Sequence, residues 1–188
     1  MNKETTVIGV AGLLIGFLLG ILVGGKLMGG HSSSGSVGSQ QAGAPMTNPG
    51  QAAARAAELE QMLAKDPKNL QAWIALGNDY FDANQPQKAV QAYTKALELD
   101  PNNPNVLTDQ GVMFRALGFY DRALANFEKA LKIDPKHLQS QFNIGIVYAT
   151  DLKQNAKARA TFEALLQKDQ TSDLARQARE MLKQLPEK

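Results

Sequence analysis

The residues that could do chemistry in this 188-residue chain are few and scattered. There are two histidines, His31 and His137, and no cysteine. Neither histidine stands in a spacing that binds zinc or completes a nucleophile–base pair. The carboxylates lie at turn and surface positions, whereas acid–base catalysis needs convergent groups in a shielded pocket. We therefore expect a protein that is not an enzyme, with no catalytic residue, no metal site and no cofactor.

One stretch matches the first part of a phosphate-binding loop. Residues 20–26 read Gly-Ile-Leu-Val-Gly-Gly-Lys, but Leu27 follows where the motif needs Ser or Thr for magnesium. The stretch also lies in an apolar segment, not between a strand and a soluble helix as the motif requires. We expect no nucleotide binding there.

The charge balance excludes a nucleic-acid-binding class. The chain carries 20 Lys and Arg against 18 Asp and Glu, a net charge of +2, and the signs are interspersed. A nucleic-acid partner would need a strongly basic face. The absence of cysteine also removes disulfides, covalent haem attachment and a lipidated N-terminal cysteine.

An uncharged, mostly apolar run fills residues 5–25, which is long enough to cross a bilayer as a helix. A cleaved signal peptide would have a shorter apolar run and a small-residue cleavage site just after it, and this run ends in Gly-Gly-Lys-Leu-Met. We predict an uncleaved, single-pass anchor over residues 1–28 in the inner (cytoplasmic) membrane. The few flanking charges, Lys3, Glu4 and Lys26, weakly favour a cytoplasmic N-terminus and a periplasmic C-terminal domain.

Four glycines recur at every fourth residue of this predicted helix and leave a groove without side chains. They are Gly12, Gly16, Gly20 and Gly24. Such small-residue faces allow a second copy or another protein's helix to pack closely. Glycine is also simply common in membrane helices.

A Gly/Ser-rich segment over residues 29–50 follows and reads as a flexible linker. Its length corresponds to about 25 Å root-mean-square for a random coil. Such a tether would raise the effective concentration of the C-terminal domain for membrane-bound partners.

A 34-residue period runs through the rest of the chain and marks a stacked helical repeat. Each unit reads as two helices and a tight turn, the first near residues 70–83 and 85–99, ended by an Asp-Pro pair. The recurring positions are Gly77, Gly111 and Gly145; Tyr80, Phe114 and Tyr148; and Asp66-Pro67, Asp100-Pro101 and Asp134-Pro135.

The pattern Trp73-x-x-Leu76-Gly77-x-x-Tyr80, followed by Ala89, Tyr93, Ala96 and Pro101, resembles the tetratricopeptide repeat. The second unit keeps Gly111, Phe114, Ala123, Phe127, Ala130 and Pro135. The third keeps Gly145 and Tyr148, then gains one residue, so that Ala158, Phe162 and Asp169 come one position late.

This resemblance implies an all-α helical-hairpin solenoid over residues 51–188 and assigns the repeated residues, Trp73 included, to its core. It has about three repeats and flanking helices: a half-repeat over 51–69, repeats over 70–103, 104–137 and 138–171, and a capping helix over 172–186.

The resemblance also implies a concave, partner-binding groove lined by the first helix of each repeat. A mixed apolar and amide surface of this kind suits an extended or helical peptide. The alternative is that these residues pack on the last helix or on each other. The implied positions are Gln71, Ile74, Asn78 and Phe81; Asn105, Thr108, Val112 and Arg115; and Gln139, Phe142, Asn143, Ile146 and Ala149.

Chaperone-binding members of the family hold an acidic tail with Lys and Arg in this groove. Here Ile74, Gln139 and Asn143 stand at those positions and only Asn78 fits, so we do not expect capture of acidic chaperone tails.

The combined features predict a membrane-anchored scaffold or adaptor for a protein or peptide partner. Its layout resembles the tetratricopeptide subunits of bacterial cytochrome c biogenesis systems, which implies a role in assembling an envelope or respiratory complex. The alternative is a structural accessory subunit docked in a larger membrane complex through its glycine-rich helix.

Overall fold

The computed structural model describes residues 49–186. The predicted anchor, its glycine face and nearly all of the predicted linker lie outside this range. Within it, none of the helices combines the length and the apolar character that a membrane crossing needs.

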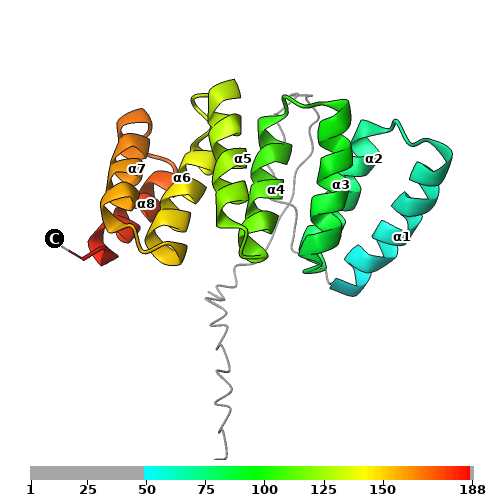
Figure 1. The fold of residues 1–188 in the computed structure, drawn as a ribbon, viewed down its shortest axis with the longest axis horizontal. Helices are drawn as coiled ribbons and strands as arrows, with labels where there is room; N and C mark the ends of the chain where they lie inside the picture. The colour runs from blue at the N-terminus through cyan, green and yellow to red at the C-terminus, as the bar shows by residue number, and fades with distance from the viewer. Residues whose placement is uncertain (1–48, 187–188) are drawn as a thin grey trace, which may run out of the picture. The chain divides into compact units, whose positions relative to one another are not determined.

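The described residues form eight α-helices and one short π-helical turn, arranged side by side in chain order (Figure 1). Helix α1 begins two residues earlier than predicted. The elements are α1 (Pro49–Lys65), α2 (Leu70–Asp82), α3 (Pro86–Leu99), α4 (Pro104–Ala116), α5 (Tyr120–Ile133), α6 (Leu138–Ile146), η1 (Val147–Asp151), α7 (Asn155–Lys168) and α8 (Asp173–Gln184). The predicted all-α solenoid is confirmed: α2–α3, α4–α5 and α6–α7 are three hairpins, flanked by α1 and α8.

The N-caps of the first helices keep the repeat in phase. Asn69, Asn103, His137 and Ser172 cap α2, α4, α6 and α8, and each side chain accepts a hydrogen bond from the backbone N–H three residues on. The spacings are 34, 34 and 35 residues. Helix α8 therefore begins where the first helix of a fourth repeat would begin, which explains how it can cap the array.

The turn inside each hairpin also recurs in phase. Asn84, Gly118 and Lys153 have φ of 54°, 79° and 56°, the left-handed conformation that commonly ends a helix. The next residue bonds back into the helix at Gln85 N to Tyr80 O (2.8 Å) and at Phe119 N to Phe114 O (2.9 Å).

The π-helical turn η1 absorbs the extra residue of the third repeat. There the backbone N–H of Leu152 donates to the carbonyl of Val147, five residues back, at 2.9 Å. A single π turn adds one residue to a helix without ending it. Helix α7 therefore lies against α6 as in the other hairpins, although its residues come one position late.

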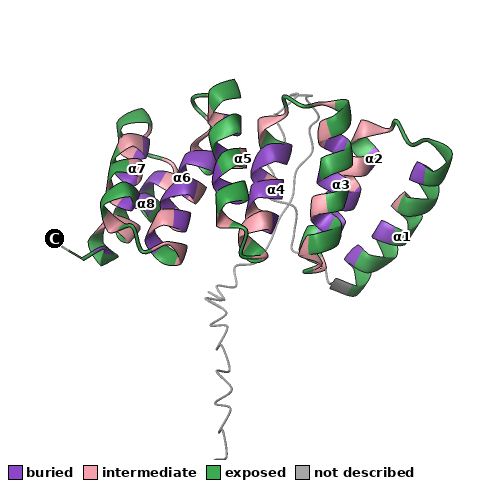
Figure 2. Cartoon of the chain, in the orientation of Figure 1, coloured by how far each residue is buried: buried purple, intermediate pink, exposed green. Residues whose placement is uncertain are grey.

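A glycine-to-ring contact sets the spacing within each hairpin. A Cβ atom built on Gly77, Gly111 or Gly145 would lie 2.4–2.5 Å from the ring of Tyr93, Phe127 or Phe162. These three rings are at most 1% exposed. The core prediction is confirmed here, and the buried side of each helix faces its neighbours (Figure 2).

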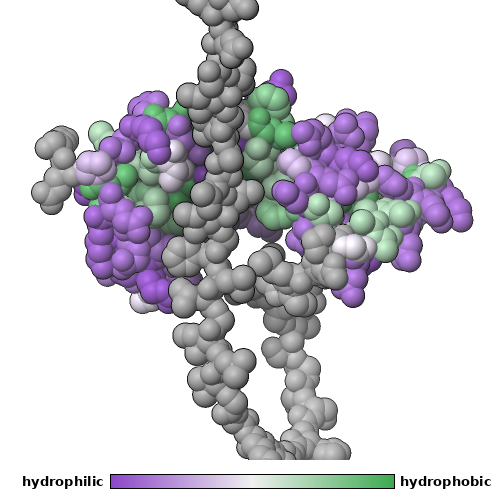
Figure 3. Space-filling view, turned by 90° about the horizontal axis from the view of Figure 1, so that it is seen from below, coloured by the Kyte–Doolittle hydropathy of each residue, from purple (hydrophilic) through white to green (hydrophobic). Residues whose placement is uncertain are grey.

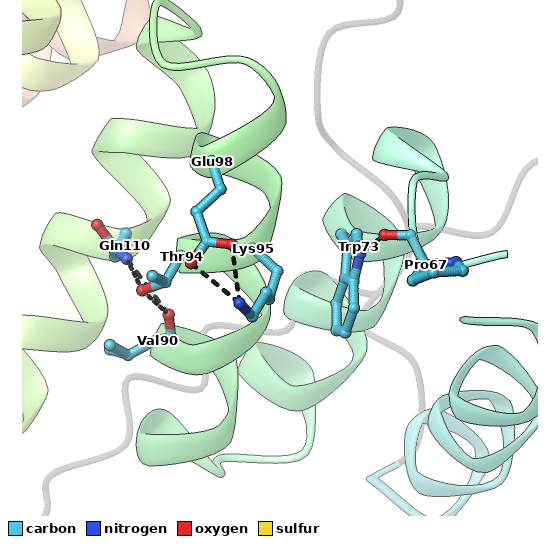
Figure 4. Close-up of polar contacts among 7 residues, drawn as sticks. All are labelled: Pro67, Trp73, Val90, Thr94, Lys95, Glu98 and Gln110. Atoms are coloured by element: carbon cyan, nitrogen blue, oxygen red, sulfur yellow. Dashed lines mark hydrogen bonds and ion pairs between the residues drawn. The ribbon is translucent and has the colours of Figure 1, made fainter. Parts of the chain in front are cut away.

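Trp73 is an exception among the predicted core residues, because it is only partly buried. Its indole Nε1 donates to the carbonyl of Pro67 at 2.9 Å (Figure 4). The ring borders a hollow of about 560 Å³ that residues of α1, α2 and α3 line. This hollow leaves Trp73 partly accessible, whereas Leu107, at the equivalent position of the next hairpin, is buried.

Gly111→Ala should destabilise the protein by about 1–3 kcal/mol through overpacking against Phe127. In a helix free of this contact, the same change would stabilise by up to about 1 kcal/mol. Urea unfolding measures the free energy. In a Phe127→Leu background the cost should shrink, and an equal cost in both backgrounds would contradict the contact.

His137 should make stability depend on pH. Its Nδ1 accepts from Ser140 N and its Nε2 lies 2.9 Å from Asn105 Oδ1, an arrangement that suits the neutral ring. Burial lowers the pKa of His137 from its ordinary 6.5. Below about pH 6.5 His137 is therefore protonated more readily in the unfolded chain than in the folded chain. The free energy of unfolding decreases as the pH falls through this range.

The substitution His137→Asn restores the cap residue of the first two repeats and should remove this loss. The measurement is the free energy of unfolding of both proteins at about pH 7.5 and about pH 5.5. The same pH dependence in the variant as in the native chain would show that His137 is not responsible.

Candidate partner-binding face

The residues predicted to line the groove come from the first helices of the hairpins, α2, α4 and α6, and from η1. We call the surface that these helices present the A-helix face. The structure divides the predicted residues by exposure. Exposed are Gln71, Asn78, Phe81, Asn105 and Gln139; partly buried are Ile74, Val112, Arg115, Asn143 and Ile146; buried are Thr108, Phe142 and Ala149.

The C-terminal part of this face is covered, so the groove prediction is wrong for Phe142. This residue is 8% exposed, and its ring centroid lies 5.6 Å from that of Phe162. Ile146 and Ala149 belong to the same apolar cluster, which includes Ala175 and Ala178 of α8. Helix α8 packs against this cluster in the way that the first helix of a fourth repeat would.

Polar contacts between repeats occupy three more predicted positions. Thr108 is 2% exposed and its hydroxyl lies 2.6 Å from the hydroxyl of Ser140, so Thr108 is unavailable to a partner. Asn105 meets His137, as described above. The guanidinium of Arg115 pairs with the carboxylate of Asp151 in η1 (Nε–Oδ2 2.5 Å). These contacts join α4 to the third repeat.

The N-terminal end of the face stays open. Gln71 and Asn78 are exposed and Phe81 is 36% exposed. Beside them α1 and α2 enclose a hollow of about 440 Å³. It is lined by Arg55, Glu58, Leu59, Met62, Ala75, Asn78, Asp79 and Asp82.

The surface seen from below shows hydrophobic patches separated by hydrophilic ones, one of them toward the α1 end (Figure 3). Met62 is 49% exposed. The visible surface therefore offers local apolar contacts set among polar groups.

Carboxylates dominate the open end. Asp79 is 5% exposed and forms an ion pair with Arg55 of α1, whose Nε also donates to it at 3.0 Å. Glu58 and Asp82 line the same hollow. The sequence prediction missed these residues, although Asp79 and Asp82 are the only charged residues of α2 and were a visible signal.

The sequence prediction also missed Asp109 of α4. Its carboxylate has no hydrogen-bond or ion-pair partner within residues 49–186, and burial raises its pKa to about 6. It lies close enough to Tyr93 to raise the pKa of that phenol, together with burial, which is the larger cause. The Tyr93 hydroxyl donates to Asn78 Oδ1 at 2.8 Å.

Asn143 occupies the position of Asp109 one repeat later. Its Nδ2 is buried and lacks a hydrogen-bond partner in the described part of the chain. The A-helix face thus contains one buried donor, the Asn143 amide nitrogen, that the described part of the chain does not satisfy, although buried polar groups are nearly always paired.

Two tetratricopeptide repeat family models match the chain, over residues 70–103 and 108–173. The human protein O-mannosyl-transferase TMTC3 is 39% identical over 88 residues, which are 46% of this chain and 10% of that protein. The chain thus spans only a small fraction of this curated relative.

Solved structures support the same fold. A tetratricopeptide repeat protein from Parabacteroides merdae has a TM-score of 0.63 at 23% identity, covering 72% of this chain and 54% of that one. The TPR2B domain of yeast Sti1 in complex with pHsp70 has a TM-score of 0.58 at 21% identity, covering 62% of this chain and 94% of that one.

Stacked hairpins with a partly open face define a helical-repeat solenoid, a class that binds other proteins and does so through its surface. The chain is a tetratricopeptide repeat protein, and the domains of this family are generally scaffolds for protein or peptide partners.

Asp109→Asn should raise the free energy of unfolding by roughly 1–3 kcal/mol at about pH 7.5, because it removes a partly buried charge that has no partner in the described part of the chain. The folded state binds a proton between the carboxyl's ordinary pKa of 3.8 and its folded value of about 6. Native stability therefore rises as pH falls through this window, and the variant's advantage should shrink at about pH 5. A less stable variant at about pH 7.5 would contradict the unpaired state of Asp109.

Proposed function

We propose that this protein is a scaffold or adaptor that binds a protein or peptide partner through the open, N-terminal part of its A-helix face. The observation that carries the proposal is the contrast along the face. Phe142 in α6 and Thr108 in α4 are buried, whereas Gln71, Asn78 and Phe81 in α2 are exposed, and Asn78 also lines the hollow between α1 and α2.

The chemistry of these side chains suits peptide binding. Gln71 can exchange hydrogen bonds with a peptide backbone, and Phe81 can contact an apolar side chain. We propose no catalytic activity.

The cellular setting of the proposal rests on the sequence. An uncharged run over residues 5–25 and a Gly/Ser-rich linker support an anchor in the inner membrane with the repeats in the periplasm. This layout supports a role in assembling an envelope or respiratory complex, of which cytochrome c biogenesis is one case. Normal cytochrome c levels in a strain that lacks the protein would rule out that case.

The partner should differ from the acidic tails that chaperone-binding relatives take. The solved yeast domain is in complex with pHsp70. In this chain Ile74 and Gln139 stand where the family's chaperone-binding members place cations, and a partly buried carboxylate, Asp109 of α4, belongs to the same face. An acidic tail would meet repulsion instead of charge-assisted hydrogen bonds.

The test is affinity purification from native membranes after chemical crosslinking. The double variant Gln71→Lys with Phe81→Lys should lose at least about tenfold in recovered partner, because both substitutions place a large charged group on the open face. The control, Gln87→Lys with Ala125→Lys, changes exposed residues of α3 and α5 and should recover as much partner as the native chain. Equal recovery from both variants would contradict the assignment.

The alternative function, a structural subunit docked through the anchor, is favoured by the four glycines at every fourth residue. Gly16→Leu with Gly20→Leu separates the two hypotheses in the same purification. Docking through the anchor requires loss of the complex, because leucine blocks close helix packing. A scaffold that uses the anchor only as a tether tolerates the change.

A further inference from the structure

A hollow of about 560 Å³ lies beside Trp73, and we call it the Trp73 hollow. Its wall from α2 consists of Trp73, Leu76 and Tyr80, whereas Asn78 and Asp82 of the same helix line the hollow between α1 and α2. Residues three or four apart share one side of a helix, so the two sets lie on different sides of α2. The Trp73 hollow is therefore a surface separate from the A-helix face, and its volume is typical of a ligand-binding pocket.

Buried apolar side chains form the floor of the Trp73 hollow. Leu63 of α1, Leu76 of α2 and Ala92 of α3 line it and are 4%, 3% and 2% exposed. The indole N–H of Trp73 is already bonded to the carbonyl of Pro67, so the ring offers a ligand only its apolar surface. A site built in this way suits a large apolar side chain.

The second repeat closes the equivalent place with hydrogen bonds. Gln110, which corresponds to Leu76, donates to the Thr94 hydroxyl at 2.8 Å (Figure 4). Asn126, which corresponds to Ala92, donates to Gln110 Oε1 at 2.8 Å. Leucine and alanine cannot form these bridges. An apolar hollow that the fold leaves open in one repeat and closes in the next indicates a binding surface.

The charged groups that line the Trp73 hollow are Glu60, Lys88 and Lys95. Glu60 accepts a hydrogen bond from the Tyr80 hydroxyl. Lys95 pairs with Glu98, although both side chains are about half exposed and such a pair contributes little. Lys88 lies over the Tyr80 ring, 5.0 Å from its centroid, and forms no ion pair in the described part of the chain. Lys88 is thus the charged group of the lining that remains available to a ligand.

We propose that the Trp73 hollow binds a peptide segment of a second protein, with a large apolar side chain against the Trp73 ring and the carboxylate of a neighbouring Asp or Glu on the Lys88 ammonium. The inference goes beyond the proposed function, because it adds a second site on another side of α2. A partner that occupied both this site and the A-helix face would gain affinity from the two linked contacts.

The position of Lys88 decides the charge of the ligand. A basic peptide would bring a like charge to this ammonium, and close like charges repel. A wholly apolar ligand would remove water from the ammonium without replacing its hydrogen bonds, which is unfavourable. A carboxylate next to the apolar side chain avoids both costs. We expect it on the α3 side of the hollow, away from Glu60 of α1.

The test begins with a random peptide library that omits tryptophan, displayed on phage. It is selected on the purified full chain in phosphatidylcholine nanodiscs, so that no free detergent fills the hollow. Selection should enrich peptides with a large apolar residue next to Asp or Glu. Trp73 is the only tryptophan of the chain, so its fluorescence reports on the hollow. Binding should shift the emission to shorter wavelength, because the peptide removes water from the ring.

A double-mutant cycle then tests the ion contact. Lys88→Gln should weaken binding of the enriched peptides about tenfold, the low end of the range for a hydrogen bond to a charged group. Replacing the peptide's Asp or Glu by Asn or Gln should cost the native chain the same factor and the Lys88→Gln variant little, because both changes remove one contact. The control Lys129→Gln removes an exposed lysine of α5 and should leave the affinity unchanged. Additive costs of the two changes would overturn the contact.

The remaining outcomes separate this inference from the proposed function. Peptides that leave the Trp73 emission unchanged, but that lose binding to the Gln71→Lys with Phe81→Lys variant, would overturn the Trp73 hollow as a site and support the A-helix face. Neutral or basic peptides that shift the emission and bind Lys88→Gln normally would overturn the acidic ligand. An emission shift that depends on protein concentration without peptide would show that a second copy fills the hollow, and no enrichment at all would also overturn the inference.

Discussion

Each hairpin of this structure depends on the close contact between a glycine, which has no side chain, and an aromatic ring of the second helix. Gly77, Gly111 and Gly145 leave room for the rings of Tyr93, Phe127 and Phe162, and even one added carbon would overlap them. Protein interiors are close-packed, so such a contact sets the distance between two helices within narrow limits. Because it recurs in every hairpin, each repeat presents its first helix to the A-helix face in a comparable position.

The third repeat shows how strongly this contact constrains the chain. One extra residue could have shifted Phe162 out of register with Gly145, yet the two meet as in the other repeats because the π turn η1 takes up the residue. The same turn places Asp151 where it pairs with Arg115. Helix α8 then packs on Phe142 and Ile146. The face is therefore closed at its C-terminal end and open toward α1 and α2.

The fold could be predicted from residues that repeat, because their contacts lie within one hairpin or between identical neighbours. Glycines, rings and Asp-Pro turns belong to this group. The site was less predictable, because the availability of a groove residue depends on what lies one repeat away. Thr108 is buried by Ser140, and Phe142 by α7 and α8. Asp109 was missed because its significance lies in the absence of a partner, and a sequence pattern cannot reveal this.

The central claim is that partners meet this protein at the open end of the A-helix face. A photo-crosslinking amino acid placed at single exposed positions of the full chain in cells tests it most directly. We expect partner adducts from Gln71 and Phe81, weaker ones from Gln139, and none from Gln87 or Ala125 on the second helices. Adducts from Gln87 and Ala125 with none from Gln71 and Phe81 would contradict the account.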